Sequence, residues 1–237
     1  MALYVYSITA ATHPKHLDGL TGVGDPPSRL RTVDAGPLSA VVSDAPEGLR
    51  PKRRDLAAHQ AVQERLMADG TVLPLRFGLI APDDDSVQSA LDERREEYVQ
   101  RLTDLEGCAE YHLKAAIDEE VLLRQILQES PEARRLNDDI KAGDTSPDLP
   151  LALGELVVQE VQARHQVLAA GLTEALRPYA RQARPSEPTG ADFLNISFLV
   201  EQDNRERFLS AEKGLTSELG EEFDLRLHGP LPAYSFV

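Results

Sequence analysis

Histidine and cysteine are the side chains of this sequence that most readily bind metals or act as catalysts. His13 and His16 are three residues apart, but Pro14 lies between them and no acidic or cysteine ligands lie beside them in the sequence. We interpret them as surface histidines. Cys108, the only cysteine, has no cysteine–histidine signature around it, so we expect a small buried residue at the start of a strand. These residues predict no metal site.

His59 and His165 are the histidines with helical spacing. His59 lies three residues after Leu56 and three before Val62, which places it on the buried face of its helix. A general base at this position needs a nucleophile as its partner, and Ser43 carries no nucleophile-elbow or triad signature. We therefore interpret His59 as a core or interface histidine and His165 as a structural one. The sequence predicts no catalytic residue.

Two further stretches suggest ligand binding at first sight. Asp83, Asp84 and Asp85 offer oxygen ligands, but adjacent carboxylates do not converge as those of a calcium loop do, so we expect a solvated helix N-terminus. The glycines between Gly19 and Gly24 are followed by two prolines where a phosphate-binding helix should begin, and the lysine of a nucleotide loop is absent. We predict a loop there and no bound cofactor.

Composition narrows the class of protein. The 237 residues contain 25 Lys and Arg against 40 Asp and Glu, a net charge of −15, which disfavours nucleic acid and anionic membranes as partners. One cysteine excludes an internal disulfide framework, and no apolar stretch is long enough to span a membrane. Aromatic residues make up only 5%, which disfavours a large aromatic cofactor. We expect a cytoplasmic protein.

The hydrophobic pattern of the first half predicts alternating strands and helices. The hairpin around Ala35-Gly36-Pro37 and the helix that stops at Gly70 are its clearest features. The predicted order is a strand at 3–8, a short helix before residue 30, strands at 30–34 and 38–43, a helix at 52–69 and a strand at 71–73. This β-α-β-β-α-β order is typical of a ferredoxin-like (split βαβ) sheet, with four antiparallel strands and helices on one face.

The second half is richer in helix. The spacing from Leu149 to Tyr179 predicts a helix of about 30 residues, or ~45 Å, which should be the longest element. The other predicted elements are a helix at 86–105, a strand at 108–115, two helices, a loop at 142–147, a strand at 194–200, a helix capped by Asp203 and a strand at 223–228. We predict an α+β protein that divides near Gly107 into two domains, 1–106 and 107–237, with the long helices in the second.

Two apolar segments are not explained by a packed core alone. Val72–Gly78 contains Arg76 and Phe77, and an arginine in an apolar run needs a buried acceptor or forms a mixed binding strip. The C-terminus holds Leu231, Tyr234 and Phe236 between and after prolines that fix an extended path. Each segment is either core structure or a partner surface, and the tail can dock within its own chain or on another molecule. These five residues are our candidate partner-binding residues.

The same segments carry a family resemblance. The relevant stretches, in order, are Tyr4-Val5-Tyr6, Ala40-Val41-Val42-Ser43, His59-x-x-Val62, Leu73-Pro74-Leu75-Arg76-Phe77-Gly78, Asn195 to Val200, and Gly229-Pro230-x-Pro232-x-Tyr234-Ser235-Phe236. Together they resemble the gas vesicle protein GvpF/GvpL family from residue 3 to the end. Leu231 and Ala233 depart from the tail pattern, where we expect an aromatic residue and a further proline.

The resemblance implies a function that the residues alone do not indicate. It implies a cytoplasmic, gas vesicle-associated accessory protein and minor vesicle component. Its partners would be the small hydrophobic shell protein and other accessory proteins, so that it limits aggregation of the shell protein and assists vesicle nucleation and assembly. It also implies two α+β domains, the C-terminal one (107–237) with long helices and its own ferredoxin-like sheet, and no enzymatic activity. The alternative is a small-molecule-binding or catalytic ferredoxin-like protein, since fold does not determine function. An enzyme should have a concave pocket with convergent polar groups and shifted pKa values around His59 or Arg76.

Overall fold

The computed structural model describes residues 1–143, 146 and 148–237, and its contacts divide the chain into two compact units. The first unit comprises residues 1–111, 199–202 and 229–237, and the second comprises 112–198 and 203–228. Three strands, β6 (Cys108–Ile117), β8 (Asp192–Glu201) and β9 (Phe223–Leu231), contribute residues to both. The sequence analysis divides the domains between residues 106 and 107, whereas the contacts group the C-terminal segment, residues 229–237, with the first unit. None of the described helices combines the length and apolar character that a membrane crossing requires.

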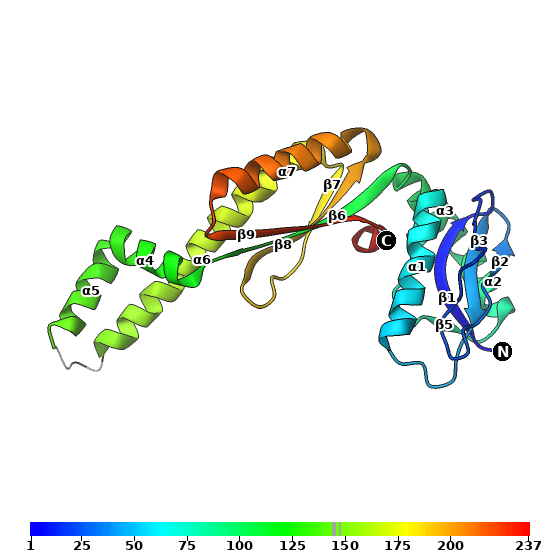
Figure 1. The fold of residues 1–237 in the computed structure, drawn as a ribbon, viewed down its shortest axis with the longest axis horizontal. Coiled ribbons are helices and arrows are strands. Elements are labelled where there is room, and N and C mark those ends of the chain that lie inside the picture. Colours follow the sequence, from blue (N-terminus) through cyan, green and yellow to red (C-terminus); the bar gives the residue numbers. More distant parts are fainter. Residues whose placement is uncertain (144–145, 147) are drawn as a thin grey trace. The chain divides into compact units, whose positions relative to one another are not determined.

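The first unit is built on an antiparallel sheet with strand order β2-β3-β1-β4 (Figure 1). Its elements are β1 (Leu3–Ala10), β2 (Arg31–Ala35), β3 (Leu38–Asp44), α1 (Arg53–Asp69), β4 (Val72–Pro74), β5 (Ile80–Ala81), α2 (Asp84–Glu93) and α3 (Arg95–Asp104). The short strand β5 also pairs with β1. The predicted hairpin between β2 and β3 and the helix that stops at Gly70 are both present.

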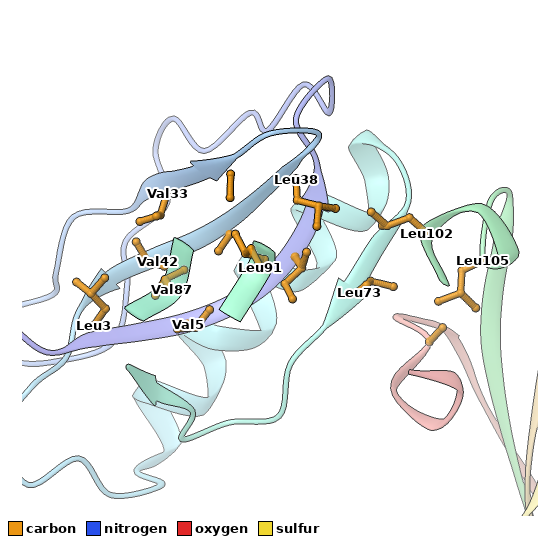
Figure 2. Packing of buried hydrophobic residues seen from close by; sticks show 14 of the residues in the cluster. Leu3, Val5, Val33, Leu38, Val42, Leu73, Val87, Leu91, Leu102 and Leu105 are labelled. Carbon is orange, nitrogen blue, oxygen red and sulfur yellow. The ribbon is translucent and has the colours of Figure 1, made fainter. Parts of the chain in front are cut away.

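Helices cover both faces of this sheet, where the sequence analysis expected one covered face. Tyr4 and Tyr6 pack with Val62 and Leu66 of α1. Leu3 and Val5 face the opposite way, where Val87 and Leu91 of α2 join them, as Figure 2 shows. A register shift between Val5 and Ser7 then reverses the alternation, so that Ile8 joins the α2 side while Ser7 faces α1. Strand β1 is therefore buried on both faces.

Two predicted helices of the first unit differ from the structure. No helix forms between residues 11 and 30, where turns and irregular backbone occupy the segment. The reason is composition, because glycine and proline disfavour helix, and the loop is held instead by a hydrogen bond from Gly24 N to the buried carboxylate of Asp55 on α1 (2.9 Å). The predicted helix at 86–105 is two helices, since Arg94 leaves the helical conformation between α2 and α3.

The second unit combines a four-stranded sheet, order β7-β8-β6-β9, with α6 and α7 (Figure 1). Its elements besides the shared strands are α4 (Glu119–Glu129), α5 (Pro131–Lys141), α6 (Asp148–Leu176), β7 (Gln182–Pro185) and α7 (Arg205–Leu219). The long helix α6 has 29 residues, in agreement with the sequence analysis. Helix α7 begins at Arg205 without a side-chain cap, so the predicted cap at Asp203 is wrong. The predicted loop at 142–147 lies partly outside the described residues. The ferredoxin-like assignment stays a prediction.

Candidate partner-binding site

A buried polar network in the first unit joins four segments that are far apart in the sequence. His59, at 5% exposure on α1, lies with its Nδ1 2.8 Å from the hydroxyl of Tyr4 on β1. The same hydroxyl accepts a hydrogen bond from Gly78 N (3.2 Å), just beyond β4. The Nε2 atom of His59 is 3.3 Å from the hydroxyl of Tyr234 in the C-terminal segment. The histidine thus holds a strand, a loop and the tail in one place.

Neighbouring polar groups extend this network along β1. Ser7 Oγ donates to Gln63 Oε1, and Gln63 Nε2 donates to the backbone carbonyl of Tyr6, both at 2.5 Å. The hydroxyl of Tyr6 is 3.0 Å from Ser43 Oγ on β3. Burial raises the pKa values of Tyr4 and Tyr6, and it lowers the pKa of His59, so the neutral forms are the stable ones. A satisfied, uncharged network of this kind fixes a unique arrangement of the segments it joins.

The three histidines of the first unit make structural contacts in separate places. His59 is closed off by tyrosine rings and by Phe77, whose centroid is 5.8 Å away, so a substrate has no access to it. His13 was predicted to lie on the surface but is 8% exposed, with Nε2 3.1 Å from the carbonyl of Leu66 at the end of α1. His16 is exposed and pairs with Asp69 at 3.0 Å. Across the described residues, no cluster of three or more His, Cys, Asp or Glu side chains suits a metal ion.

The C-terminal segment docks within its own chain, in the first unit. The backbone N and Oγ of Ser235 donate to the two carboxylate oxygens of Glu110 at 2.8 and 2.6 Å, and Glu110 is 3% exposed. Phe236 is buried in the same core as Leu3 and Leu73. Residues 234–236 form a 3₁₀ turn, so the extended path predicted for the tail is wrong beyond Leu231. The turn is what lets Ser235 reach Glu110 while Phe236 enters the core.

Gly229 explains why the terminal motif begins with glycine. A Cβ atom at this position would lie 2.6 Å from a ring carbon of Tyr111 and 2.9 Å from the carbonyl oxygen of Glu110. Both neighbours belong to β6, which β9 approaches closely here. Only glycine allows this approach, which brings the tail to Glu110.

Residues 76–80, which we call the exposed strip, present apolar side chains and one arginine to solvent. Leu79 and Ile80 are 47% and 49% exposed, although their backbone is fixed: Val5 N donates to Leu79 O (3.0 Å), and Ile80 pairs with Tyr4 in the sheet. Arg76 is exposed and has no hydrogen-bond or ion-pair partner within residues 1–143, 146 and 148–237. Phe77 points inward, with its ring centroid 5.6 Å from that of Tyr4. The strip is therefore an exposed surface on a rigid support.

A shallow groove of about 360 Å³ adjoins the exposed strip. Pro74, Leu75 and Arg76 line it together with Arg94, with Tyr98 and Arg101 of α3, and with Tyr234 and Val237. Glu97 is the one carboxylate side chain among the lining residues. Its Oε1 forms ion pairs with Arg94 Nη2 (2.8 Å) and Arg101 Nε (3.2 Å). The hydrogen bond from Arg94 is the chief cause that lowers the pKa of Glu97. Three arginines against one glutamate make the groove locally positive in a chain of net charge −15.

The five candidate residues of the sequence analysis therefore occupy different environments. Arg76 is exposed, Phe77, Leu231 and Tyr234 are half-buried, and Phe236 lies in the core. Arg76 and Tyr234 line one groove, although 157 positions separate them. Sequence reasoning missed Glu110, Arg94, Arg101, Leu79 and Ile80. A glutamate within the apolar strand at 108–115 was the one available signal, because a buried carboxylate requires a partner.

Comparison with known proteins gives a family match over nearly the whole chain. The family model described as gas vesicle synthesis protein GvpL/GvpF matches residues 2–237. The chain is 46% identical to gas vesicle protein F of Streptomyces sp. (strain CB03234) over 100% of both chains. It is 29% identical to gas vesicle protein L of the same organism, covering 99% of this chain and 92% of that protein. It is therefore more similar to the F protein than to the L protein of that strain.

Two crystal structures share the fold. Gas vesicle protein GvpF from Anabaena sp. PCC7120 superposes with a TM-score of 0.86 at 22% identity, covering 99% of this chain and 97% of that chain. GvpF from Microcystis aeruginosa gives a TM-score of 0.81 at 24% identity, covering 99% and 98%. Both are similar in their mixed helix and sheet architecture from end to end.

Proposed function

The chain belongs to the gas vesicle synthesis protein GvpL/GvpF family, and we propose that it binds the hydrophobic shell protein of the gas vesicle. In this proposal it is a cytoplasmic, vesicle-associated accessory protein without enzymatic activity. It covers apolar surface of the shell protein before assembly, limits its aggregation and assists vesicle nucleation. Other accessory proteins of the vesicle are further proposed partners.

The observation that carries this proposal is the exposed strip. Leu79 and Ile80 hold about half of their side-chain surface in water, on a backbone fixed to β1. Exposed apolar side chains that a protein holds rigidly lose little entropy on binding, so burying them against a partner stabilises a complex. An apolar partner surface is a suitable occupant because about 25 cal/mol is gained for each Å² of apolar area removed from water.

Charge adds a requirement on the partner. Arg76 belongs to the strip, makes no ion pair among the described residues, and also lines the groove that holds Arg94 and Arg101. A partner segment with an acidic side chain beside its apolar residues would give Arg76 a bidentate carboxylate contact. The remaining acidic surface of the chain would keep the complex soluble by repelling other complexes. We therefore propose an apolar segment flanked by a carboxylate as the bound element.

The alternative function, small-molecule binding or catalysis, has weaker support. The relatives are named gas vesicle proteins rather than enzymes. His59 is sealed by tyrosine hydroxyls and rings, and its lowered pKa follows from burial in a structural network. The groove at Arg76 is shallow and lacks a nucleophile among its lining residues apart from the hydroxyls of Tyr98 and Tyr234.

Co-expression with the shell protein tests the proposal. The two proteins should co-purify, and the fraction of shell protein that stays soluble should rise in proportion to the amount of this chain. An unrelated acidic protein of similar size serves as the control for general solubilisation. Failure to co-purify, together with an unchanged soluble fraction, would remove the proposed function.

A further inference from the structure

Strand β9 forms one edge of the sheet of the second unit. The strand order is β7-β8-β6-β9, so within the described residues β9 pairs with β6 on one side and leaves its other edge open. The part of β9 in the second unit, residues 223–228, is six residues long, a length that suits pairing with another strand. An open edge offers a row of unpaired backbone N–H and C=O groups to any compatible chain.

The two faces of β9 differ in character. Phe223 packs on Phe193, with ring centroids 6.4 Å apart, and Phe193 stacks on His165 of α6, so the face of Phe223, Leu225 and Leu227 is the helix-covered one. The alternate residues are Asp224, Arg226 and His228. The guanidinium of Arg226 forms an ion pair with the carboxylate of Asp192. Lys114 Nζ lies 3.7 Å from Asp192 Oδ2, and Arg226 Nε lies 3.1 Å from Asp224 Oδ2. The side chain of Asp224 is 65% exposed at this edge.

We propose that β9 is an interface for a second copy of this chain, in which two β9 strands pair antiparallel about a two-fold axis at Leu225. In this register, Asp224 of each copy lies opposite Arg226 of the other, and Glu222 lies opposite His228. Phe223 lies opposite Leu227 on the helix-covered face. The Asp224–Arg226 charge pair occurs twice by symmetry, so it adds its contribution twice.

Other registers are disfavoured by the same residues. Moving the axis by one residue, to residue 224 or 226, sets Asp224 against itself or Arg226 against itself, and like charges directly opposite destabilise a sheet. Placing the axis between two residues sets the apolar face of one strand beside the polar face of the other. The axis at Leu225 keeps both faces continuous and sets no like charges directly opposite each other.

This charge pattern selects a second copy over an unrelated strand. To match this edge, an antiparallel partner strand must carry a basic residue opposite Asp224 and an acidic residue opposite Arg226. A second copy of β9 meets both requirements, whereas an unrelated strand meets them only by chance. Repulsion between the net charges of −15 acts only at short range, because physiological salt screens exposed charges more than about 8 Å apart. The inference concerns the second unit and does not depend on the proposed function of the exposed strip.

Cysteine cross-linking measures the register directly. In a Cys108→Ser background, Leu225→Cys should give a disulfide-linked dimer under mild oxidation, because directly opposite Cα atoms are about 4.5–5.5 Å apart, within disulfide range. Leu227→Cys is the matched control: its two copies would be displaced by four residues, about 14 Å, which is too far to link. Equal linkage of the two variants, or none with Leu225→Cys, would overturn the proposal.

Charge variants supply the second test, by sedimentation velocity over increasing concentration. Wild type should associate into dimers, and Asp224→Arg, which sets two arginines against each other twice, should raise the dissociation constant by about tenfold or more. Glu221→Lys changes the net charge equally but lies opposite Gly229, so it should dimerise at least as well as wild type. A mixture of Asp224→Arg with Arg226→Asp should form heterodimers. A wild-type chain that stays monomeric up to about 100 µM, or that binds other proteins through β9 but not itself, would contradict the inference.

Discussion

The sheet of the first unit and the helical region α4–α6 of the second are stabilised very differently. The sheet is buried on both faces, and its larger cluster joins residues from β1, β2, β3, α2, α3, β8 and the C-terminal segment. The cluster that joins α4, α5 and α6 has Leu122, Ile126 and Ala133 as its fully buried members, with partly buried residues of α6 around them. Leu151 and Val158 on α6 remain 63% and 55% exposed.

This difference bears on where a binding surface is useful. In the first unit, a buried network fixes the backbone beneath the exposed strip, so binding there requires little reorganisation. In the helical region, a small core gives a low cost of local opening. We therefore propose the first unit as the place of partner binding and expect the helical region to be the more dynamic part.

The largest effect is expected from the tail. Deleting residues 231–237 leaves the carboxylate of Glu110 buried without its Ser235 partner and removes Phe236 from the core. The first unit should lose its cooperative unfolding transition, while the second unit keeps its helical signal. Phe236→Ala, a milder change, should lower the free energy of unfolding by about 3–5 kcal/mol in chemical denaturation. Removing only the exposed Val237 is the control, and equal stability of the 231–237 deletion would show that the tail does not hold the core.

A core substitution in the helical region should have a smaller and more local effect. Ile126→Ala removes one of three buried side chains and should cost about 2 kcal/mol. Hydrogen exchange should accelerate in α4 and α5, with the amides of β1 unchanged. Acceleration throughout both units would mean that the regions unfold together and that the contrast between them is wrong.

Acid should weaken the first unit through His59. Burial keeps the pKa of His59 below its ordinary value of about 6.5, and His13 is shifted in the same direction by its burial. Above about pH 6.5 the imidazole of His59 is mainly neutral in both the folded and the unfolded chain. As the pH falls below this value the unfolded state takes up protons first, so stability decreases until the folded pKa is passed. His59→Gln should flatten this acid slope in thermal melts, and the same acid slope in wild type and in His59→Gln would show that His59 does not cause it.

The smallest effect on stability is expected at Arg76. Because its guanidinium is exposed and makes no ion pair among the described residues, Arg76→Ala should change the free energy of unfolding by less than about 0.5 kcal/mol. Its affinity for an acidic apolar partner should nevertheless fall. A large loss of stability would instead reveal a structural role for this side chain.

Much of this arrangement follows from local patterns in the sequence. Alternation predicted β8, helical spacing predicted α6, and the Ala35-Gly36-Pro37 turn predicted the hairpin, because each depends on neighbouring residues. The missing helix before residue 30 was not predicted, although the glycines and prolines of that segment disfavour a helix, and the helical spacing of 86–105 gives no sign of the break at Arg94.

The site required information that local patterns do not contain. The sequence identified Arg76 and Tyr234 as unusual, but their meeting in one groove depends on strand order and on the close approach at Gly229. The sequence left Phe236 as either core structure or partner surface, and the structure places it in the core. The partner of Glu110 lies 125 positions away, beyond the reach of any periodicity.

The central claim is that the exposed strip of the first unit binds the shell protein, and a pair of double variants tests it most directly. Leu79→Ser with Ile80→Ser removes the apolar side chains of the strip, whereas Leu151→Ser with Val158→Ser removes side chains of comparable exposure from α6. Each variant is co-expressed with the shell protein, and the co-purified amount is measured against wild type. The account predicts loss of co-purification with the first variant and wild-type recovery with the second. The reverse result, with both variants folded, would contradict it.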